Sequence, residues 1–520
     1  MAPPAALLSP VASNPIPNRV LPERLPRICV SIAARQAAEM IATAEHAVRS
    51  NSFIEFRLDY LAQPAAAMPR LREFLSGRPQ LVALATCRKT QSGGHFRGSV
   101  EAECAILAKA AQAGCQWLDL SLESAERLPA HTLRQLRARA NVMISFHDLE
   151  TTRHLAAVEQ RMRALSADLY KAVWTAKRLV DNVKVLRWGA DLPAPRVAFC
   201  LGETGQASRI LAVQAGSPFT YAAAAAGEET GPGQLDAATL ERVFHLGEIN
   251  RATRVYGVLG HPIGHSLSPL MLNTAFRRAS VNAVYVPLET RHAEEALELA
   301  RQLPLGGFSV TLPHKTALLK VLDGVDPLAR QVGAINTVVR SAGKFYGYNT
   351  DVAGITGPLE ALGTLEKKRV LVLGAGGAAR AAVFGLRARG AEVHICNRTP
   401  ARARQLAKAA GAKVILRREL KKTDFDILVQ ATPVGQFPKP GQSPLESEEI
   451  RAGIVFDLVY NPLATELLKR AQARGARVIP GLEMFVAQGA AQFEIWTGKP
   501  APRQEMYHAV LSQLQRPAGR

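Results

Sequence analysis

The sequence predicts an α/β protein: a closed parallel (βα)8 barrel, followed by a two-domain α/β region that contains a nucleotide-binding sheet. Three observations support this class. Strand-like runs alternate with amphipathic segments in the first half, a new strand pattern starts near residue 253, and a glycine-rich turn follows a later strand. The composition, 48% hydrophobic and 21% charged, excludes a largely disordered chain. No apolar run reaches about 18 residues, so we expect no membrane-spanning helix.

The 520 residues include 64 Lys and Arg against 44 Asp and Glu, and 64 − 44 gives a net charge of +20. Such a charge favours anionic ligands or a nucleic-acid partner. The basic stretches 133–139 and 402–422 lack interleaved aromatic residues, so we interpret them as solvated helix faces and expect no nucleic-acid partner. Six scattered cysteines without a C-x-x-C pair indicate reduced thiols inside the cell.

Residues 1–24 are rich in Pro and Ala, and no acidic residue precedes Glu23, so we interpret them as a disordered tail. A transit peptide is the alternative. Because serine is sparse and the first arginine is Arg19, we expect a cytoplasmic protein and leave a plastid location open. We expect a monomer or a homodimer.

The evenly spaced strand-like runs of the first half predict a (βα)8 (TIM) barrel over residues 25–248. An open doubly wound sheet is the alternative, but no glycine-rich phosphate turn follows the first run. The eight runs are 27–32, 53–61, 80–88, 117–122, 141–148, 168–174, 196–202 and 219–224.

Charged residues gather at the ends of these runs. Glu55, Arg57 and Asp59 alternate along the second run, so we expect them on one side of a strand, where they need a partner or a ligand. Active sites of this fold lie at the carboxyl ends of the strands. Later runs contribute Arg88, His147, Asp148, Lys171 and Arg209.

Lys171 has the most apolar surroundings of these residues, in the segment LYKAVW. Burial among apolar groups lowers the pKa of a lysine, which then acts as an imine-forming nucleophile. A paired structural charge is the alternative for any one of these residues, but their convergence favours an active site.

The first half resembles type I 3-dehydroquinate dehydratase over about residues 26–240. The matching pieces, in the family's order, are EFRLD, TCR, SFHD, DLYKAV, the Ser-Arg of GQASR, and GPGQ. The resemblance implies a Schiff base at Lys171, proton transfer by His147, and a positioning role for Glu55. It implies substrate contacts from Arg57, Arg88, Arg209 and Gln234. Thr230 and Gly231 stand where the family often has Ser, so that contact stays open.

The second half begins with the run VYGVLG and the segment HPIGHSLSP. His261 and His265 are four residues apart, but the intervening Pro and Gly oppose a helix and no H-E-x-x-H glutamate is present, so we expect no metal site. Ser266 and Ser268 offer hydroxyl groups from an extended segment that suits a carboxylate. A helix cap is the alternative interpretation.

Three polar residues, Lys315, Asn336 and Asp351, each follow a short apolar run, in GFSVTLPHK, GAINTVV and GYNTD. Loop residues of these types are usually solvated or cap helices. A Lys–Asp pair could, however, give a proton to a developing alkoxide.

The segment KRVLVLGAGGAARAAVFGL is typical of a Rossmann nucleotide site, because a strand runs into Gly374-x-Gly376-x-x-Ala379 and then into a helix. An NAD enzyme would show Asp or Glu about 20 residues later. This chain instead has HICNRTPAR, with Arg398 and Arg402, whose guanidinium groups suit a 2′-phosphate. The sequence therefore favours NADP(H) over NAD.

The second half resembles shikimate dehydrogenase over about residues 253–515, through SLSP, TLPHK, INT, NTD, GAGGAAR and NRT. The resemblance implies Lys315 and Asp351 as the catalytic pair. Substrate contacts would come from Ser266, Ser268, Thr311, Asn336, Tyr460 and Gln488. The cofactor would contact Gly374, Ala375, Gly376, Gly377, Ala378, Asn397, Arg398, Thr399, Arg402, Gly481 and Met484. Pro433 stands where the family often has Ser, and we expect it to affect loop geometry near the cofactor.

We therefore expect a substrate-binding domain at 253–354, completed by about 487–515, and a Rossmann domain at 355–486. Together the resemblances predict a bifunctional enzyme of the shikimate pathway, which serves chorismate and aromatic amino-acid biosynthesis. It would convert 3-dehydroquinate to 3-dehydroshikimate and reduce that product to shikimate with NADPH. A variant that also uses quinate is one alternative. A non-enzymatic, metabolite-sensing regulator is another, although the expected catalytic groups are present.

Overall fold

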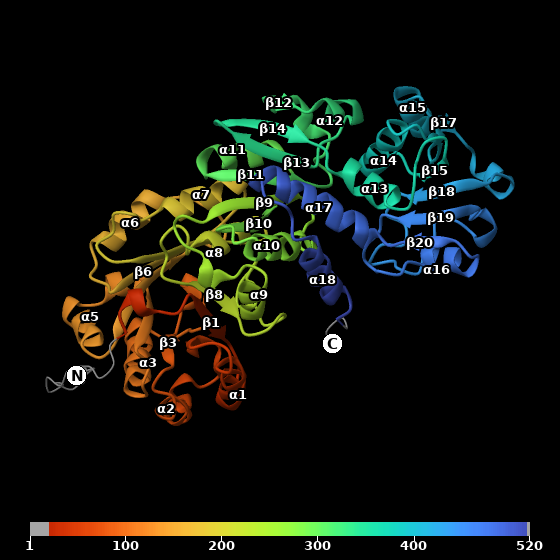
Figure 1. Cartoon of the computed structure of the whole chain (residues 1–520). Coiled ribbons are helices and arrows are strands. Elements are labelled where there is room, and N and C mark those ends of the chain that lie inside the picture. Colours follow the sequence, from red (N-terminus) through yellow and green to blue (C-terminus); the bar gives the residue numbers. More distant parts are fainter. Residues whose placement is uncertain (1–19, 517–520) are drawn as a thin grey trace. The chain divides into compact units, whose positions relative to one another are not determined.

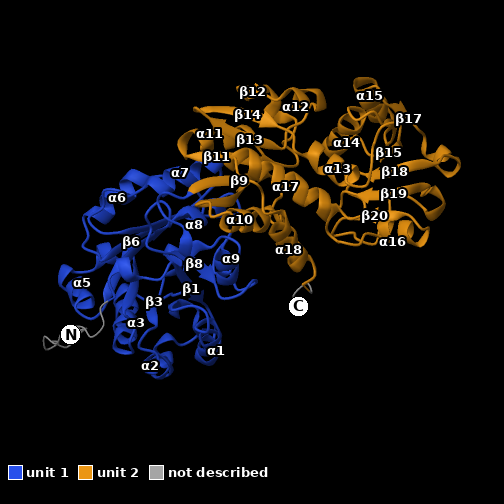
Figure 2. Ribbon diagram, viewed as in Figure 1, with its two compact units in different colours: residues 1–253 blue, residues 254–520 orange. Residues whose placement is uncertain are grey.

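The computed structural model describes residues 20–516, and the chain divides into two compact units after Thr253 (Figure 2). Each unit has its own sheets and core. None of the helices in the described part is long and apolar enough to cross a membrane.

The first unit contains eight parallel strands in the order β7-β6-β5-β4-β3-β2-β1-β8, so the last strand returns to pair with the first (Figure 1). This arrangement confirms the predicted barrel. Strand β3 (Val82–Thr86) is buried along its whole length, as expected for a parallel strand covered on both faces. The other strands are β1 (Ile28–Ile32), β2 (Phe53–Arg57), β4 (Trp117–Ser121), β5 (Asn141–His147), β6 (Leu169–Thr175), β7 (Arg196–Leu201) and β8 (Thr220–Ala223).

Helices follow the strands and bury their apolar faces. For example, α3 starts where the Ser99 hydroxyl accepts a hydrogen bond from the Ala102 amide at 3.2 Å. Trp174 on β6 is fully buried, and its ring lies 5.3 Å from that of Trp188 after α7. The helices are α1 (Ala37–Ala47), α2 (Met68–Ser76), α3 (Val100–Gln112), α4 (Leu122–Arg127), α5 (Ala130–Arg137), α6 (Leu155–Arg163), α7 (Leu179–Arg187), α8 (Gln206–Leu211) and α9 (Ala237–Arg242).

The predicted tail, residues 1–24, differs from the structure at its end. Pro22–Arg24 form a 3-10 helix, and the Asn141 side chain donates a hydrogen bond to the Val20 carbonyl at 2.8 Å. Residues 20–24 are therefore part of the fold because they cover the start of β5. The remainder of the predicted tail, residues 1–19, lies outside the described residues.

The second unit begins with a mixed sheet in the order β10-β9-β11-β13-β14-β12, in which β13 runs antiparallel to β11. Its strands are β9 (Arg254–Gly260), β10 (Ala283–Glu289), β11 (Leu305–Val310), β12 (Gly324–Val325), β13 (Thr337–Ser341) and β14 (Lys344–Tyr348). Its helices are α10 (Ser268–Arg278), α11 (Glu294–Gln302), α12 (Pro327–Val332) and α13 (Asp351–Glu360).

A second, fully parallel sheet follows in the order β17-β16-β15-β18-β19-β20, the Rossmann strand order. In Figure 1, α14 and α15 lie on one side of it and α16 on the other. The strands are β15 (Arg369–Leu373), β16 (Glu392–Cys396), β17 (Lys413–Val414), β18 (Phe425–Gln430), β19 (Ala452–Asp457) and β20 (Arg477–Ile479). The helices are α14 (Gly377–Arg387), α15 (Pro400–Ala410) and α16 (Glu466–Ala473).

The chain then returns to the first sheet of this unit through α17 (Gly481–Thr497) and α18 (Arg503–Leu514). Leu482 and Phe485 already pack in the core that contains Tyr256 and Phe276, so this return starts before residue 487. Helix α17 lies close to α13, because a Cβ at Gly354 would come within 3.0 Å of the Met484 carbonyl oxygen. The return therefore packs α17 against both α13 and the core of the first sheet.

Two candidate active sites

Lys171 lies in the barrel within a compact set of buried charges. Its Nζ donates to Asp119 Oδ2 at 3.2 Å, and Arg88 Nη2 donates to the same oxygen at 2.7 Å. The hydroxyl group of Ser145 donates to the other oxygen, Oδ1, at 2.5 Å. The Lys171 ammonium also lies 3.9 Å from the centre of the Tyr221 ring. Adjacent strands align these groups, since Thr86 pairs with Asp119 and Ser145 with Lys171 in the ladders.

The surroundings of Lys171 favour its neutral form. Burial lowers the pKa of Lys171, Asp119 partly opposes this shift, and Arg88 lowers the pKa further. Burial alone would raise the pKa of Asp119, but Arg88 and Lys171 lower it on balance. A lysine in these surroundings can act as a nucleophile, and the carboxylate beside it stays ionised.

His147 ends β5 at the same end of the barrel. Burial lowers the pKa of His147 well below its usual value, and Arg88, Lys171 and Arg57 lower it further. Its Nδ1 is buried without a hydrogen-bond partner in the described chain. A neutral imidazole with a free nitrogen beside Lys171 can accept a proton from a bound molecule.

The Glu55 carboxylate forms no hydrogen bond with Nδ1 of His147. Its two oxygens instead accept hydrogen bonds from Ser31 Oγ at 2.5 Å and Thr86 Oγ1 at 2.6 Å, on the neighbouring strands. Any positioning of His147 by Glu55 would therefore need a different contact from the direct bond to Nδ1.

Arg57 ends β2, and Asp59 lies beyond it on a 3-10 helix (Leu58–Tyr60), so the three alternating charges are not all on one strand as predicted. The turn lets the Asp59 carboxylate accept two hydrogen bonds from Arg57, at 2.9 and 2.7 Å. The Asp148 carboxylate also bonds to nearby residues of its own loop, because it accepts hydrogen bonds from the backbone amides of Glu150 and Thr151.

Arg209 and Gln234 come together near the GPGQ segment. Arg209, on α8, donates to the Pro232 carbonyl at 3.1 Å, and its Nε is buried without a partner in the described chain. Burial lowers the pKa of Arg209 to about 10. Gln234 accepts hydrogen bonds from the amide and hydroxyl of Thr230, at 2.7 and 3.1 Å. An orphaned guanidinium nitrogen next to a polar loop is suited to an anionic ligand.

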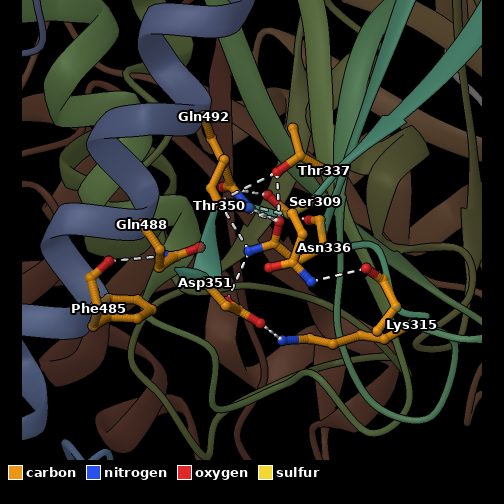
Figure 3. A network of polar contacts seen from close by, with 11 residues as sticks. Ser309, Lys315, Asn336, Thr337, Thr350, Asp351, Phe485, Gln488 and Gln492 are labelled. Atoms are coloured by element: carbon orange, nitrogen blue, oxygen red, sulfur yellow. Dashed lines mark hydrogen bonds and ion pairs between the residues drawn. The ribbon is translucent and has the colours of Figure 1, made fainter. Parts of the chain in front are cut away.

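In the second unit, Lys315 Nζ donates to Asp351 Oδ2 at 2.5 Å, and Asn336 Nδ2 donates to Asp351 Oδ1 at 2.7 Å (Figure 3). Asp351 starts α13, and Asn336 precedes β13. The sequence placed these three residues in separate loops, and the fold brings them into one cluster.

A buried hydrogen-bond network that the sequence did not indicate supports this cluster. Gln492 on α17 donates to the Asn336 carbonyl at 3.2 Å and accepts from Ser309 Oγ at 2.7 Å (Figure 3). Ser309 in turn accepts from Tyr285 Oη at 2.5 Å. Gln492 is one helical turn after Gln488, and that spacing is the signal in the sequence that could have indicated it.

The other predicted substrate residues occupy distinct places. Ser268 is the first residue of α10, not part of an extended segment, and its amide donates to Ser266 Oγ at 3.3 Å. The Thr311 amide donates to the Leu259 carbonyl. Gln488 donates to the Phe485 carbonyl at 2.8 Å (Figure 3). The Tyr460 ring stacks on Phe485 with the centroids 4.4 Å apart, and burial raises its pKa.

The two histidines of HPIGH have separate partners. His261 Nδ1 lies 3.0 Å from Glu289 Oε1, and the His265 ring contacts Phe437. Within residues 20–516, no group of three or more His, Cys, Asp or Glu residues could hold a metal ion.

The Rossmann sheet borders a pocket of about 710 Å³. Gly374 has a φ of +113°, which L residues with a side chain rarely adopt, and Gly376 caps α14 with open space where a Cβ would stand. A dinucleotide pyrophosphate fits such a turn, because it can approach the free amides of the helix N-terminus. The predicted residues that line the pocket are Gly374, Ala375, Gly376, Asn397, Arg398 and Arg402.

The remaining predicted cofactor residues do not line this pocket. Gly377 and Ala378 form the first turn of α14, and a Cβ at Gly377 would lie 3.4 Å from Lys315 Cδ. Thr399 caps α15, and its carbonyl accepts a hydrogen bond from Asn397. Gly481 and Met484 lie in the first turn of α17.

Besides Gln492, two more residues at these sites were missed by the sequence interpretation. Asp119 lies in the strand-like run WLDLSL and was not selected. A single carboxylate in a buried run, between the runs that bear Arg88 and Lys171, could have indicated a partner for these cations. Arg417 lies in the stretch that we interpreted as solvated helix faces, but it follows β17 on a 3-10 helix and lines the cofactor pocket. The Arg417 side chain is 59% exposed, as a solvated face predicts, but the interpretation did not include a place beside the pocket.

Family models match most of the chain. The model for type I 3-dehydroquinase matches residues 28–251, and the shikimate dehydrogenase substrate-binding domain matches 258–338. The shikimate/quinate 5-dehydrogenase model matches residues 359–437, and the shikimate 5'-dehydrogenase C-terminal domain matches 481–511.

A bifunctional 3-dehydroquinate dehydratase/shikimate dehydrogenase, chloroplastic, from Arabidopsis thaliana is 32% identical over 510 residues, which cover 94% of this chain and 84% of that protein. The chain belongs to this bifunctional family. The NADP(+)-dependent shikimate dehydrogenase of Bacillus cereus strain AH187 is 40% identical over 273 residues, 50% of this chain and 99% of that protein. A solved shikimate dehydrogenase in complex with NADP+ is 37% identical, with a TM-score of 0.50, covering 52% of this chain and 98% of that chain.

Family membership confirms the predicted fold class and the predicted fusion of a dehydratase with a shikimate dehydrogenase. The choice of NADP(H) from Arg398 and Arg402 agrees with NADP(+) in the name of the Bacillus relative. The roles of individual residues, the domain boundaries and the oligomeric state stay predictions.

Proposed function

We propose that the chain catalyses two successive steps of the shikimate pathway, with one active site in each unit. The first unit dehydrates 3-dehydroquinate to 3-dehydroshikimate, and the second reduces 3-dehydroshikimate to shikimate with NADPH. The observation that supports this most strongly is the pair of lysine–aspartate clusters: Lys171 with Asp119, and Lys315 with Asp351.

In the first step, Lys171 Nζ attacks the substrate ketone and expels water to form an iminium ion, an electron sink next to C2. His147 removes the C2 proton, the electron pair moves toward the iminium, and the C1 hydroxyl leaves with a proton from His147. Hydrolysis then frees the lysine. The carboxylate and hydroxyls of the substrate are held by Arg57, Arg88, Arg209 and Gln234. Glu55 supports the site from β2, where it accepts hydrogen bonds from Ser31 and Thr86 on the neighbouring strands.

In the second step, the pocket at the Rossmann sheet would hold NADPH, which would supply a hydride. Lys315 donates a proton to the oxygen as it becomes an alkoxide, and Asp351 keeps the ammonium aimed at that oxygen. Asn336 and Gln488 bind the substrate hydroxyls, Ser266 and Ser268 its carboxylate, with Thr311 and Tyr460 completing the substrate pocket. The glycine turn would hold the pyrophosphate, and Arg398 and Arg402 would bind the 2′-phosphate.

The test supplies the purified chain with 3-dehydroquinate and NADPH and identifies the product by mass spectrometry. Shikimate is the expected product. Accumulation of 3-dehydroshikimate would contradict the dehydrogenase assignment, quinate would contradict the order of the steps, and unchanged 3-dehydroquinate would contradict both activities.

For the cellular context, the cytoplasm and a monomer or homodimer remain the proposal. Fractionation of cells that express the full chain tests the compartment, and recovery with plastids would contradict it. Light scattering of the purified chain tests the oligomeric state, and a mass above that of two chains would contradict it.

A further inference from the structure

One wall of the cofactor pocket is not explained by the residues that suit phosphates. It is formed by β17, the segment after it, and the loops that follow β18. Its residues are mainly apolar: Val414, Ile415, Leu416, Val434, Pro444 and Leu445. β17 pairs with β16 at Val414 and Ile395, so this wall adjoins the strand that ends before Asn397. An apolar slot of this kind suits a flat heteroaromatic ring and not a phosphate.

Arg417 is the charged residue of this wall, and a bidentate ion pair holds it in place. Its Nε and Nη2 donate to the two Glu449 oxygens at 2.9 and 2.8 Å. Glu449 is itself fixed, because it accepts a hydrogen bond from the Glu446 amide at 2.8 Å and its side chain is 6% exposed. The Arg417 side chain, in contrast, is 59% exposed and lines the pocket, whereas Glu449 does not.

We propose that the face of the Arg417 guanidinium stacks on the adenine ring of the dinucleotide and that Glu449 is its positioning residue. The proposal rests on the use of NADP(H) and specifies which part of it this wall binds. The carboxylate occupies one edge of the guanidinium and offsets its charge, so a phosphate would have to compete with Glu449. The planar face stays available, and arginine faces stack on aromatic rings and bases.

In this arrangement the 2′-phosphate binds to Arg398 and Arg402, on the other wall of the pocket. Neither forms an ion pair with a carboxylate in residues 20–516, so no carboxylate competes with an anion for either side chain. Because adenine is common to NADP and NAD, Arg417 contributes to the affinity for both dinucleotides and leaves the choice between them unchanged. Arg398 and Arg402 make that choice.

The test measures dissociation constants of NADPH and NADH by direct titration of the full chain. Arg417→Ala weakens both by a similar factor of about ten, the size of a lost base-stacking contact. Arg417→Lys is as weak as Arg417→Ala, because an ammonium keeps the charge but has no planar face. Arg418→Ala is the matched control: it removes the same charge from the same 3-10 helix at an exposed residue outside the pocket wall, and binding is unchanged.

Two further measurements separate stacking from general damage. The reduction rate with reduced nicotinamide mononucleotide, which lacks the adenosine half, is the same in Arg417→Ala and the unmodified chain. Glu449→Gln weakens NADPH and NADH equally, by about threefold, as the loss of one partly exposed ion pair predicts. A Glu449→Gln variant that lost activity with the mononucleotide as well would contradict the positioning role.

Weaker binding of NADPH alone, restored by Arg417→Lys, would overturn the proposal in favour of a phosphate contact. Unchanged binding of both dinucleotides by Arg417→Ala would also overturn it. Failure of the unmodified chain to bind NADPH would instead contradict the cofactor assignment, so the two failures are distinguishable.

Discussion

Both units pair a lysine with an aspartate, but the surroundings of the two pairs differ. In the barrel, the Asp119 oxygen that contacts Lys171 also binds Arg88, and the side chains of both members of the pair are almost fully buried, at 4% and 1% exposed. In the dehydrogenase unit, the second oxygen of Asp351 is bound by the neutral amide of Asn336, and Lys315 is 18% exposed.

This difference matches the two kinds of chemistry. A second cation at the same carboxylate, together with burial, lowers the pKa of Lys171 and favours the free amine that an imine requires. An amide at the carboxylate adds no competing charge, and its hydrogen bond holds Asp351 in place beside Lys315. We therefore expect that the third group at each carboxylate, and not the residue type alone, sets the role of the lysine.

The largest expected effect comes from exchanging each lysine in turn. Lys171→Ala lowers the dehydratase rate by at least about 10⁴-fold, as expected for a lost covalent nucleophile, and leaves reduction of 3-dehydroshikimate intact. Separate steady-state assays of the two reactions on the full chain check this. Loss of both activities in one variant would contradict the assignment of one lysine to each reaction.

The next effect is on proton transfer in the second unit. Lys315→Ala lowers kcat for 3-dehydroshikimate reduction by about a thousandfold, within the range for a removed general acid. The dissociation constant of NADPH changes little, and the dehydratase activity serves as the control. A variant that changed only KM would indicate that Lys315 binds substrate without transferring a proton.

The role of the second cation is tested by pH. Burial lowers the pKa of Lys171 first and Arg88 adds to this shift, so Arg88→Gln raises the pKa of Lys171. The acid limb of the dehydratase kcat profile then moves up by about one pH unit. Because the pKa of His147 is well below its usual value, His147 does not determine that limb. An acid limb that stayed in place would show that Arg88 acts only on substrate binding.

The smallest effect concerns the pH dependence of the unfolding free energy, through Glu103 on α3 of the barrel. Burial raises the pKa of Glu103 on α3 to about 7, partly opposed by its hydrogen bond from Ser124. The folded-state pKa lies above the unfolded value, so Glu103 stabilises the fold most at acidic pH, and this contribution is lost as pH rises to about 7. The unfolding free energy of the natural chain therefore falls by about 2 kcal/mol relative to Glu103→Gln between pH 5 and pH 8. Denaturant titrations at both pH values check the difference, and parallel curves would contradict it.

The features that could be predicted from the sequence are those that a local pattern determines. The strand-like runs that bear Lys171 and His147, and the glycine turn at Gly374, follow from apolar periodicity and turn chemistry. Asp119 and Gln492 were not assigned in this way, because their partners come from other strands and helices, which the fold brings together. The place of Arg417 beside the pocket was missed for the same reason: β17 is two residues long, and its pairing with β16 brings the segment that follows β17 to the pocket.

The most direct test of the comparison is to trap the imine. The full chain is incubated with 3-dehydroquinate and sodium borohydride, and the modified peptide is identified by mass spectrometry. The account predicts one reduced adduct on Lys171 and none on Lys315, with no adduct in Lys171→Ala. An adduct on Lys315, or full dehydratase turnover without any adduct, would contradict the claim that the third group at each carboxylate decides which lysine is the nucleophile.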